Sequence, residues 1–125
     1  GAFSLFPGIE RNLTVISGPG FDLRGDGLFL PARPLQPVAF AGDVAVSAEA
    51  VRAPSDDFNV MTARHLPRPE VGVLYAPTNL AKGGTLALFA LGNGSVNGQS
   101  LGQYELMLTD EPAETLGKMI SVRLW

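Results

Sequence analysis

Glycine and proline interrupt this chain so often that few helices can form between them. The 125 residues include 15 glycines and 10 prolines, and the longest stretch free of both is the 12-residue run Ser55–Leu66. Because both residues disfavour helix interiors, and a typical helix spans about 11–12 residues, most segments are too short to be helical. We therefore predict an all-β protein, with room for a helix only at Ser55–Leu66 and for a helical turn at Glu111–Leu116.

The segments between these breaks are apolar and rich in β-branched residues, which is typical of strands. Asp26-Gly27 predicts a hairpin, and Asn93-Gly94 and Asn97-Gly98 predict tight turns. We expect about ten short antiparallel strands: Asn12–Ser17, Phe21–Leu23, Leu28–Leu30, Pro37–Phe40, Val44–Val51, Phe58–Thr62, Val71–Tyr75, Thr85–Leu91, Gln103–Thr109 and Lys118–Leu124.

Strands at this spacing favour a β-sandwich or a β-barrel. The segment Thr85–Leu91 is apolar on both faces, so it has to be covered on both sides or packed within a closed barrel. Neither a linker nor an internal repeat is evident. We therefore interpret residues 1–125 as a single domain.

The charge pattern excludes several classes of partner. The formal net charge is −3, and no two of the nine Lys and Arg residues are adjacent, so a direct nucleic-acid partner is not expected. No apolar run approaches the about 20 residues that span a bilayer, and no signal-peptide pattern opens the sequence, which predicts a cytoplasmic protein without membrane partners.

The residue types needed for metal or covalent chemistry are scarce. The chain has no cysteine, and its only histidine is His65. Because catalytic metal sites commonly use two or three histidines, we expect no metal ion and no cofactor. A Ser/His/Asp triad built on His65 stays open, but an ordinary loop histidine is the favoured interpretation.

Two stretches are better candidates for a binding site. Arg11 stands at the start of an apolar strand, where its guanidinium can point inward and bind a carboxylate; the alternative is a surface arginine paired with Glu10 or another acid. Alternation along a strand places Asp57, Asn59 and Met61 on one face. That combination suits a small polar ligand, whereas a solvated edge strand is the alternative.

At these stretches the sequence resembles the HutD/Ves family. The matching segments cover Phe3–Gly20, which begins Phe-Ser-Leu-Phe-Pro-Gly-Ile-Glu-Arg, then Pro37–Asp43, Asp57–Thr62 and Met119–Trp125. The resemblance runs from end to end of this chain. Members of the family open with a further segment containing Trp-Lys-Asn-Gly-Gly, so we expect the first strands of the family fold to be absent here.

The resemblance implies a cupin-like double barrel (a bicupin) without the metal-binding histidines of ordinary cupins. It also implies an accessory or regulatory protein of histidine utilisation, or a stress-linked one, that binds a small carboxylate of the urocanate or formate kind. Carried onto this sequence, it places the anion on Arg11 and makes Asn59 and Met61 the pocket wall. Asp57 then becomes the residue that orients Arg11.

Two other functions compete with non-enzymatic binding. A metal-independent cupin-type isomerase or hydrolase could use Asp57 or Glu10 as general base, because burial raises the pKa of a carboxyl group. A protein-interaction module could instead dock a partner on exposed strand edges. The sequence is also compatible with a homodimer.

Overall fold

The structure, a computed structural model, describes residues 1–125, and its regular elements are all β-strands. The predicted all-β class is therefore confirmed. The chain divides into two compact units, Gly1–Leu66 and Pro67–Trp125. It forms no helix with the length and hydropathy needed to cross a membrane.

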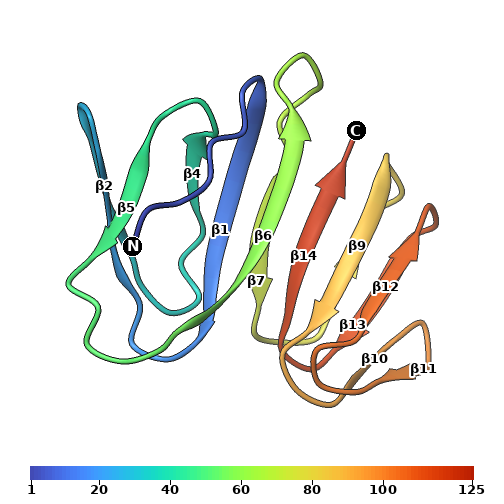
Figure 1. Cartoon of the computed structure of the whole chain (residues 1–125). Coiled ribbons are helices and arrows are strands. Elements are labelled where there is room, and N and C mark those ends of the chain that lie inside the picture. The colour runs from blue at the N-terminus through green and yellow to red at the C-terminus, as the bar shows by residue number, and fades with distance from the viewer. The chain divides into compact units, whose positions relative to one another are not determined.

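The first unit contains six strands in two antiparallel sheets (Figure 1). One sheet has the order β4-β1-β6 and the other has the order β3-β2-β5. The strands are β1 (Ile9–Ser17), β2 (Phe21–Gly25), β3 (Leu28–Ala32), β4 (Val38–Ala41), β5 (Val46–Glu49) and β6 (Asp56–Ala63).

The second unit has two four-stranded sheets, ordered β12-β9-β14-β7 and β11-β10-β13-β8. Its strands are β7 (Glu70–Leu74), β8 (Thr78–Leu80), β9 (Thr85–Ala90), β10 (Gly94–Val96), β11 (Gln99–Leu101), β12 (Leu106–Thr109), β13 (Ala113–Leu116) and β14 (Met119–Leu124).

The two units repeat one pattern of strand pairing. The ladders β1–β4, β1–β6, β2–β3 and β2–β5 of the first unit recur, in the same chain order, as β9–β12, β9–β14, β10–β11 and β10–β13. The second unit adds β7 beside β14 and β8 beside β13. This repeat is not evident in the sequence, because it lies in the pairing order and not in the residues.

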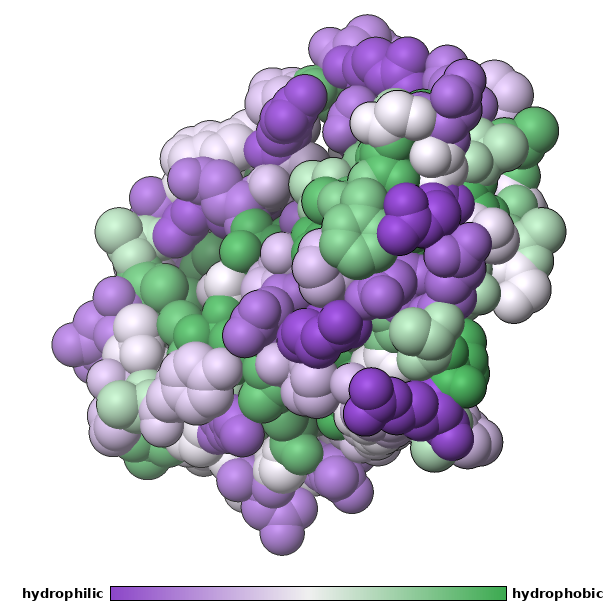
Figure 2. Space-filling view, turned by 90° about the vertical axis from the view of Figure 1, so that its left-hand side faces the viewer, coloured by the Kyte–Doolittle hydropathy of each residue, from purple (hydrophilic) through white to green (hydrophobic).

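Each unit has a hydrophobic core of its own. In the first unit, Leu13 and Val15 on β1 and Leu23 on β2 are fully buried, and they belong to one apolar cluster. In the second unit, Leu88 on β9 and Val96 on β10 hold the corresponding positions in a second cluster. The side of the first unit seen in Figure 2 mixes hydrophilic and hydrophobic residues and shows no continuous apolar patch.

Several details of the predicted fold were wrong. The strands number fourteen, not about ten, and they form four separate sheets, not one closed barrel. The two segments that had room for a helix are strands: β6 occupies Asp56–Ala63, which includes the predicted strand Phe58–Thr62, and β13 occupies Ala113–Leu116. In each segment the side chains alternate between two faces, and this period of two outweighs the length that would have permitted a helix.

The predicted turns are confirmed where two short strands meet. Asp26-Gly27 connects β2 to β3, and Asn97-Gly98 connects β10 to β11. Asn97 and Gly98 have φ angles of 50° and 79°. Two consecutive positive φ angles are the signature of the type I′ hairpin turn, which the Asn-Gly pair favours.

Candidate functional site

The candidate site is built around Arg11, which lies on the interior face of β1. Side chains alternate along this strand, so Arg11 shares its face with the fully buried Leu13 and Val15. Arg11 itself is 6% exposed. The alternative of a solvated surface arginine is therefore wrong. Glu10 projects from the opposite face and pairs with Arg64 at 3.5 Å, not with Arg11.

Strand β6 supplies the polar neighbours of Arg11. Its register opposite β1 pairs Met61 with Arg11, Asn59 with Leu13 and Asp57 with Val15, so all three β6 side chains lie on the face of Arg11. The Nη2 group of Arg11 donates a hydrogen bond to Oδ1 of Asn59 at 3.0 Å. The Nδ2 group of Asn59 donates in turn to Oδ1 of Asp57 at 2.6 Å.

This relay fixes the orientation of the Asn59 amide. Because its NH₂ group is held by the Asp57 carboxylate, its carbonyl oxygen must face Arg11. Asp57 thus acts on Arg11 through Asn59 and forms no direct ion pair with it. The amide holds the guanidinium in place while leaving its charge without an adjacent carboxylate.

Three aromatic rings surround the guanidinium. Its central carbon, Cζ, lies 5.4 Å from the centre of the Phe3 ring, 5.2 Å from Phe6 and 5.1 Å from Phe40. These distances are within the range of cation–π attraction, which partly offsets the loss of water around a buried cation. Phe40 lies opposite Arg11 on β4, so the antiparallel register alone brings these two together.

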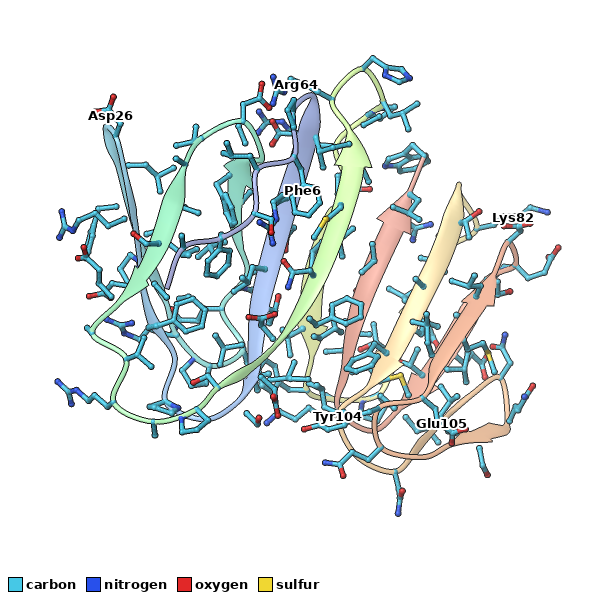
Figure 3. All side chains as sticks on the ribbon, in the orientation of Figure 1. Phe6, Asp26, Arg64, Lys82, Tyr104 and Glu105 are labelled. Atoms are coloured by element: carbon cyan, nitrogen blue, oxygen red, sulfur yellow. The ribbon has the colours of Figure 1, made fainter.

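The segment before β1 carries the other two rings, and backbone hydrogen bonds hold it in place. Phe3 N donates to Val46 O and Phe6 N donates to Gly42 O, both at 2.9 Å. Gly42 is needed there, since a Cβ at that position would lie 2.5 Å from Phe6 O. Figure 3 shows Phe6 alongside β1. The position of this ring therefore depends on a close approach that only glycine permits.

A group of charges secures the same segment from the other side. Arg64, in the turn after β6, binds both carboxylate oxygens of Asp43 and approaches Glu10 (Figure 3). Asp43 also accepts a hydrogen bond from Gly8 N at 3.0 Å. Arg64 lowers the pKa of Asp43, and Asp43 raises the pKa of Arg64, mainly through their side-chain hydrogen bonds. Both side chains are well exposed, so we assign this group a positional role.

The positive charge of Arg11 has no carboxylate in direct contact with it. Burial lowers the pKa of Arg11, and the charge of Asp57 only partly opposes that shift. Burial likewise raises the pKa of Asp57, although the hydrogen bond from Asn59 and the charge of Arg11 lower it. The Nε atom of Arg11 is buried and has no hydrogen-bond partner. A buried donor without a hydrogen-bond partner lowers the stability of the folded protein. An acceptor from a ligand that bonded to Nε of Arg11 would remove this cost.

The structure thus brings together Arg11, Asn59 and Asp57, which the resemblance to the HutD/Ves family had implied as parts of one site. Met61 lies on the same face opposite Arg11, but it is 44% exposed. The aromatic ring of Phe40 and those of the segment before β1 were not predicted from the sequence. A signal was available, because these phenylalanines stand within two of the segments that resemble the HutD/Ves family.

The other chemistry considered for this chain has no comparable geometry. His65 is exposed in the turn that follows β6. No group of three or more His, Asp and Glu side chains is placed to hold a metal ion. Arg11 is the one buried charged side chain of the chain, and it connects to Asp57 through Asn59.

Comparison with known proteins finds one family and two similar solved structures. The family model described as HutD matches residues 1–120. The formate-condition structure of HutD from Pseudomonas fluorescens SBW25 is similar over 99% of this chain and 72% of its own, with a TM-score of 0.90 and 28% identity. A conserved protein of unknown function from Pseudomonas aeruginosa PAO1 is similar over 100% of this chain and 77% of its own, with a TM-score of 0.72 and 28% identity.

Proposed function

The chain belongs to the HutD family, and from that premise we propose that it is a non-enzymatic accessory protein of histidine utilisation that binds a small carboxylate through Arg11. One observation carries the proposal. The buried guanidinium of Arg11 has a hydrogen bond only to the neutral amide of Asn59, and its Nε donor has no partner.

A bound carboxylate would supply what this guanidinium lacks. Two carboxylate oxygens match the paired donors of a guanidinium, and a charge-assisted pair of this kind is strong in a site shielded from water. The Asn59 amide cannot neutralise the cation, and Asp57 is one side chain further away. The positive charge therefore stays available to an incoming anion.

The surroundings favour a small and planar acid. The rings of Phe3, Phe6 and Phe40 lie within cation–π distance of the guanidinium, and flat apolar rings of this kind pack better against a planar acid than against a bulky one. Formate and urocanate are both planar carboxylates. The formate-condition structure of the P. fluorescens HutD makes formate the first acid to test.

The proposal is tested by calorimetric titration of the full chain with formate and with urocanate. We expect saturable binding, and we expect Arg11→Met to weaken it by roughly ten- to a hundredfold, the equivalent of losing about 1.5–3 kcal/mol of charge-assisted hydrogen bonding. Arg24→Met is the matched control, because Arg24 pairs with Glu49 on the exposed side of β2, outside the site. Circular dichroism checks that both variants stay folded.

Undiminished binding in a folded Arg11→Met variant would show that the anion sits elsewhere. Equal losses in the Arg11 and Arg24 variants would indicate attraction by net charge and not by a built site. Arg11→Lys sharpens the result further, since it keeps the charge and loses the two-pronged geometry of the guanidinium. We expect its affinity to lie between those of the parent and Arg11→Met.

The raised pKa of Asp57 favours one second candidate, a metal-independent enzyme with Asp57 as general base. A measurement of substrate conversion distinguishes the binding protein from the enzyme. Incubation of the chain with urocanate, followed by NMR detection of products, gives no conversion if the protein only binds. Conversion that disappears in Asp57→Asn would instead favour the enzyme, because this substitution keeps an acceptor for Asn59 but cannot take up a proton.

A further inference from the structure

The second unit contains a cavity of its own on its interior face. It has a volume of about 240 Å³ and lies along β7, β14 and β9, which neighbour one another in Figure 1. Its lining consists of Glu70, Val71, Gly72, Leu80, Leu86, Ser121 and Arg123. Cavities that hold drug-sized ligands are larger, about 300–1,000 Å³, so this one suits a smaller molecule.

The cavity occupies the place in the strand pattern that Arg11 holds in the first unit. Arg11 is the third interior residue of β1 counted back from Val15, and Leu86 is the third interior residue of β9 counted back from Ala90. Across the equivalent ladders, Arg11 pairs with Met61, whereas Leu86 pairs with Arg123. Each unit therefore has one arginine in this cross-strand pair. In the first unit it lies on β1, and in the second unit it lies on β14, the strand equivalent to β6.

One nitrogen of the Arg123 guanidinium forms a hydrogen bond, and the other two do not. Its side chain is 16% exposed, and its Nη1 group donates to Gly83 O at 2.5 Å. The Trp125 ring lies 5.6 Å from its Cζ atom. Neither Nε nor Nη2 forms a hydrogen bond, because the nearest carboxylate oxygen, on Glu70, is 4.0 Å from Nε. Two donors of a mostly buried guanidinium thus remain available to a ligand.

Glu70 makes this site differ in charge from that of Arg11. It pairs with Arg123 across β7 and β14, and its Oε2 atom accepts a hydrogen bond from Trp125 Nε1 at 2.6 Å. Its side chain is 63% exposed, and Oε1 has no hydrogen-bond partner. A cation and an anion therefore stand side by side at the mouth, each with unused hydrogen-bonding capacity.

The base of the cavity is open because Gly72 has no side chain. Gly72 pairs with Ser121 across the same ladder, and a Cβ on Gly72 would lie 3.9 Å from Ser121 Oγ, an ordinary contact distance. The φ angle of Gly72 is not in the left-handed region, so alanine would fit without backbone strain. The Ser121 hydroxyl faces the space that alanine would fill.

We propose that this cavity binds a small zwitterion of the α-amino acid class. The carboxylate would take the Nε and Nη2 donors of Arg123, and the ammonium would take Oε1 of Glu70. A simple carboxylate would satisfy Arg123 but would face repulsion from Glu70, and a simple amine would face the reverse. Only a ligand with both charges uses both groups, which distinguishes this cavity from the Arg11 site.

The test is an NMR titration of the ¹⁵N-labelled full chain with L-alanine, and in parallel with acetate and methylamine. We expect saturable shifts of the Gly72 and Ser121 amide signals with L-alanine, and at least tenfold weaker responses to acetate and to methylamine. Gly72→Ala places a methyl group in the cavity beside Ser121 and is expected to weaken L-alanine binding at least tenfold. Glu70→Gln removes the charge that holds the ammonium and is expected to do the same.

Arg24→Met is the control, because Arg24 pairs with Glu49 on the exposed side of β2, outside both sites, and we expect it to leave the L-alanine shifts of Gly72 and Ser121 unchanged. Absence of saturable shifts at millimolar L-alanine would overturn the proposal. Acetate that shifts the Gly72 and Ser121 signals at concentrations as low as L-alanine does would overturn it too, since the cavity would then be an anion site. Equal losses in Arg24→Met and Gly72→Ala would also overturn it, because the shifts would not come from this cavity. None of these outcomes depends on whether the Arg11 site binds a carboxylate.

Discussion

The two units of this chain pair their strands in one pattern but place different chemistry at the same point of it. In the unit Gly1–Leu66 this point is occupied by Arg11 of β1, which is 6% exposed and has the neutral amide of Asn59 as its hydrogen-bond partner. In the unit Pro67–Trp125 the arginine is Arg123 of β14, which donates a hydrogen bond to a backbone carbonyl and lies 4.0 Å from the carboxylate of Glu70.

The difference between the two arginines lies in the distance to a counter-charge. Asp57 reaches Arg11 only through Asn59, whereas Glu70 pairs directly across the ladder with Arg123. A guanidinium without an adjacent carboxylate attracts an anion, while one beside a carboxylate forms a neutral pair. The same scaffold can therefore present a cationic or a balanced site, depending on one neighbouring side chain.

The largest expected effect tests whether each unit has an independent core. Leu13 and Leu88 are both fully buried and occupy equivalent interior positions of β1 and β9. We expect Leu13→Ala and Leu88→Ala each to lower the free energy of unfolding by about 2–5 kcal/mol, because each leaves a cavity. Hydrogen exchange should lose protection mainly in residues 1–66 for the first variant and in residues 67–125 for the second.

Denaturant titration measures the loss of stability, and exchange followed by mass spectrometry locates it. Identical exchange patterns for the two variants would break the comparison, since the chain would then open as one cooperative unit. Leu116→Ala is a suitable control in the same chain, because Leu116 is 54% exposed and its truncation leaves no buried cavity.

A smaller effect separates the roles of the two arginines in stability. We expect Arg11→Met to change the free energy of unfolding by less than about 1 kcal/mol, because relief from burying a charge offsets both the lost hydrogen bond to Asn59 and the lost attraction to three rings. Arg123→Met should lower it by about 1–2 kcal/mol, since the Gly83 carbonyl loses its donor and Trp125 loses its cation. Thermal and urea unfolding of both variants provide the measurement.

The opposite order would mean that Arg11 is a structural residue. In that case the buried guanidinium would be stabilising the first unit, and its unpartnered Nε would not indicate a ligand. The comparison is informative because residues kept for binding commonly cost stability, whereas residues kept for folding do not.

Much of the fold could be predicted from the sequence, because glycine, proline and alternation act locally. The Asn97-Gly98 turn and the β1 strand follow from residues a few positions apart. The number of sheets and the repeated pairing do not, since they depend on contacts between distant strands. Short polar strands such as Thr78–Leu80 also escaped prediction, because three residues show no clear periodicity.

The candidate site was predicted in part for the same reason. Alternation along β6 is a local property, so the shared face of Asp57, Asn59 and Met61 was accessible to sequence analysis. The Asn59 relay and the ring of Phe40 depend on the register between strands, which the sequence does not specify. Arg123 was not singled out, because its partner Glu70 is 53 positions away and only the β7–β14 ladder brings them together.

The smallest expected effect is a pH dependence confined to the first unit. At one interior position the first unit has the titratable Asp57 opposite Val15, whereas the second unit has Met119 opposite Ala90. Burial raises the pKa of Asp57 in the folded state, although the Asn59 hydrogen bond and the Arg11 charge limit the shift. At pH values above that raised pKa, the ionised carboxylate of Asp57 therefore lowers the free energy of unfolding.

The sign follows from linkage between protonation and folding. The penalty is present above the folded-state pKa of Asp57, is relieved as pH falls through that value, and is absent below the unfolded pKa of about 3.9. We expect the stability advantage of Asp57→Asn over the parent to be least near pH 4 and to grow as pH rises to 8, measured by urea unfolding. An advantage greatest at acid pH would mean that the native site stabilises the carboxylate, as Arg64 stabilises Asp43, and that Arg11 already has its anion within the chain.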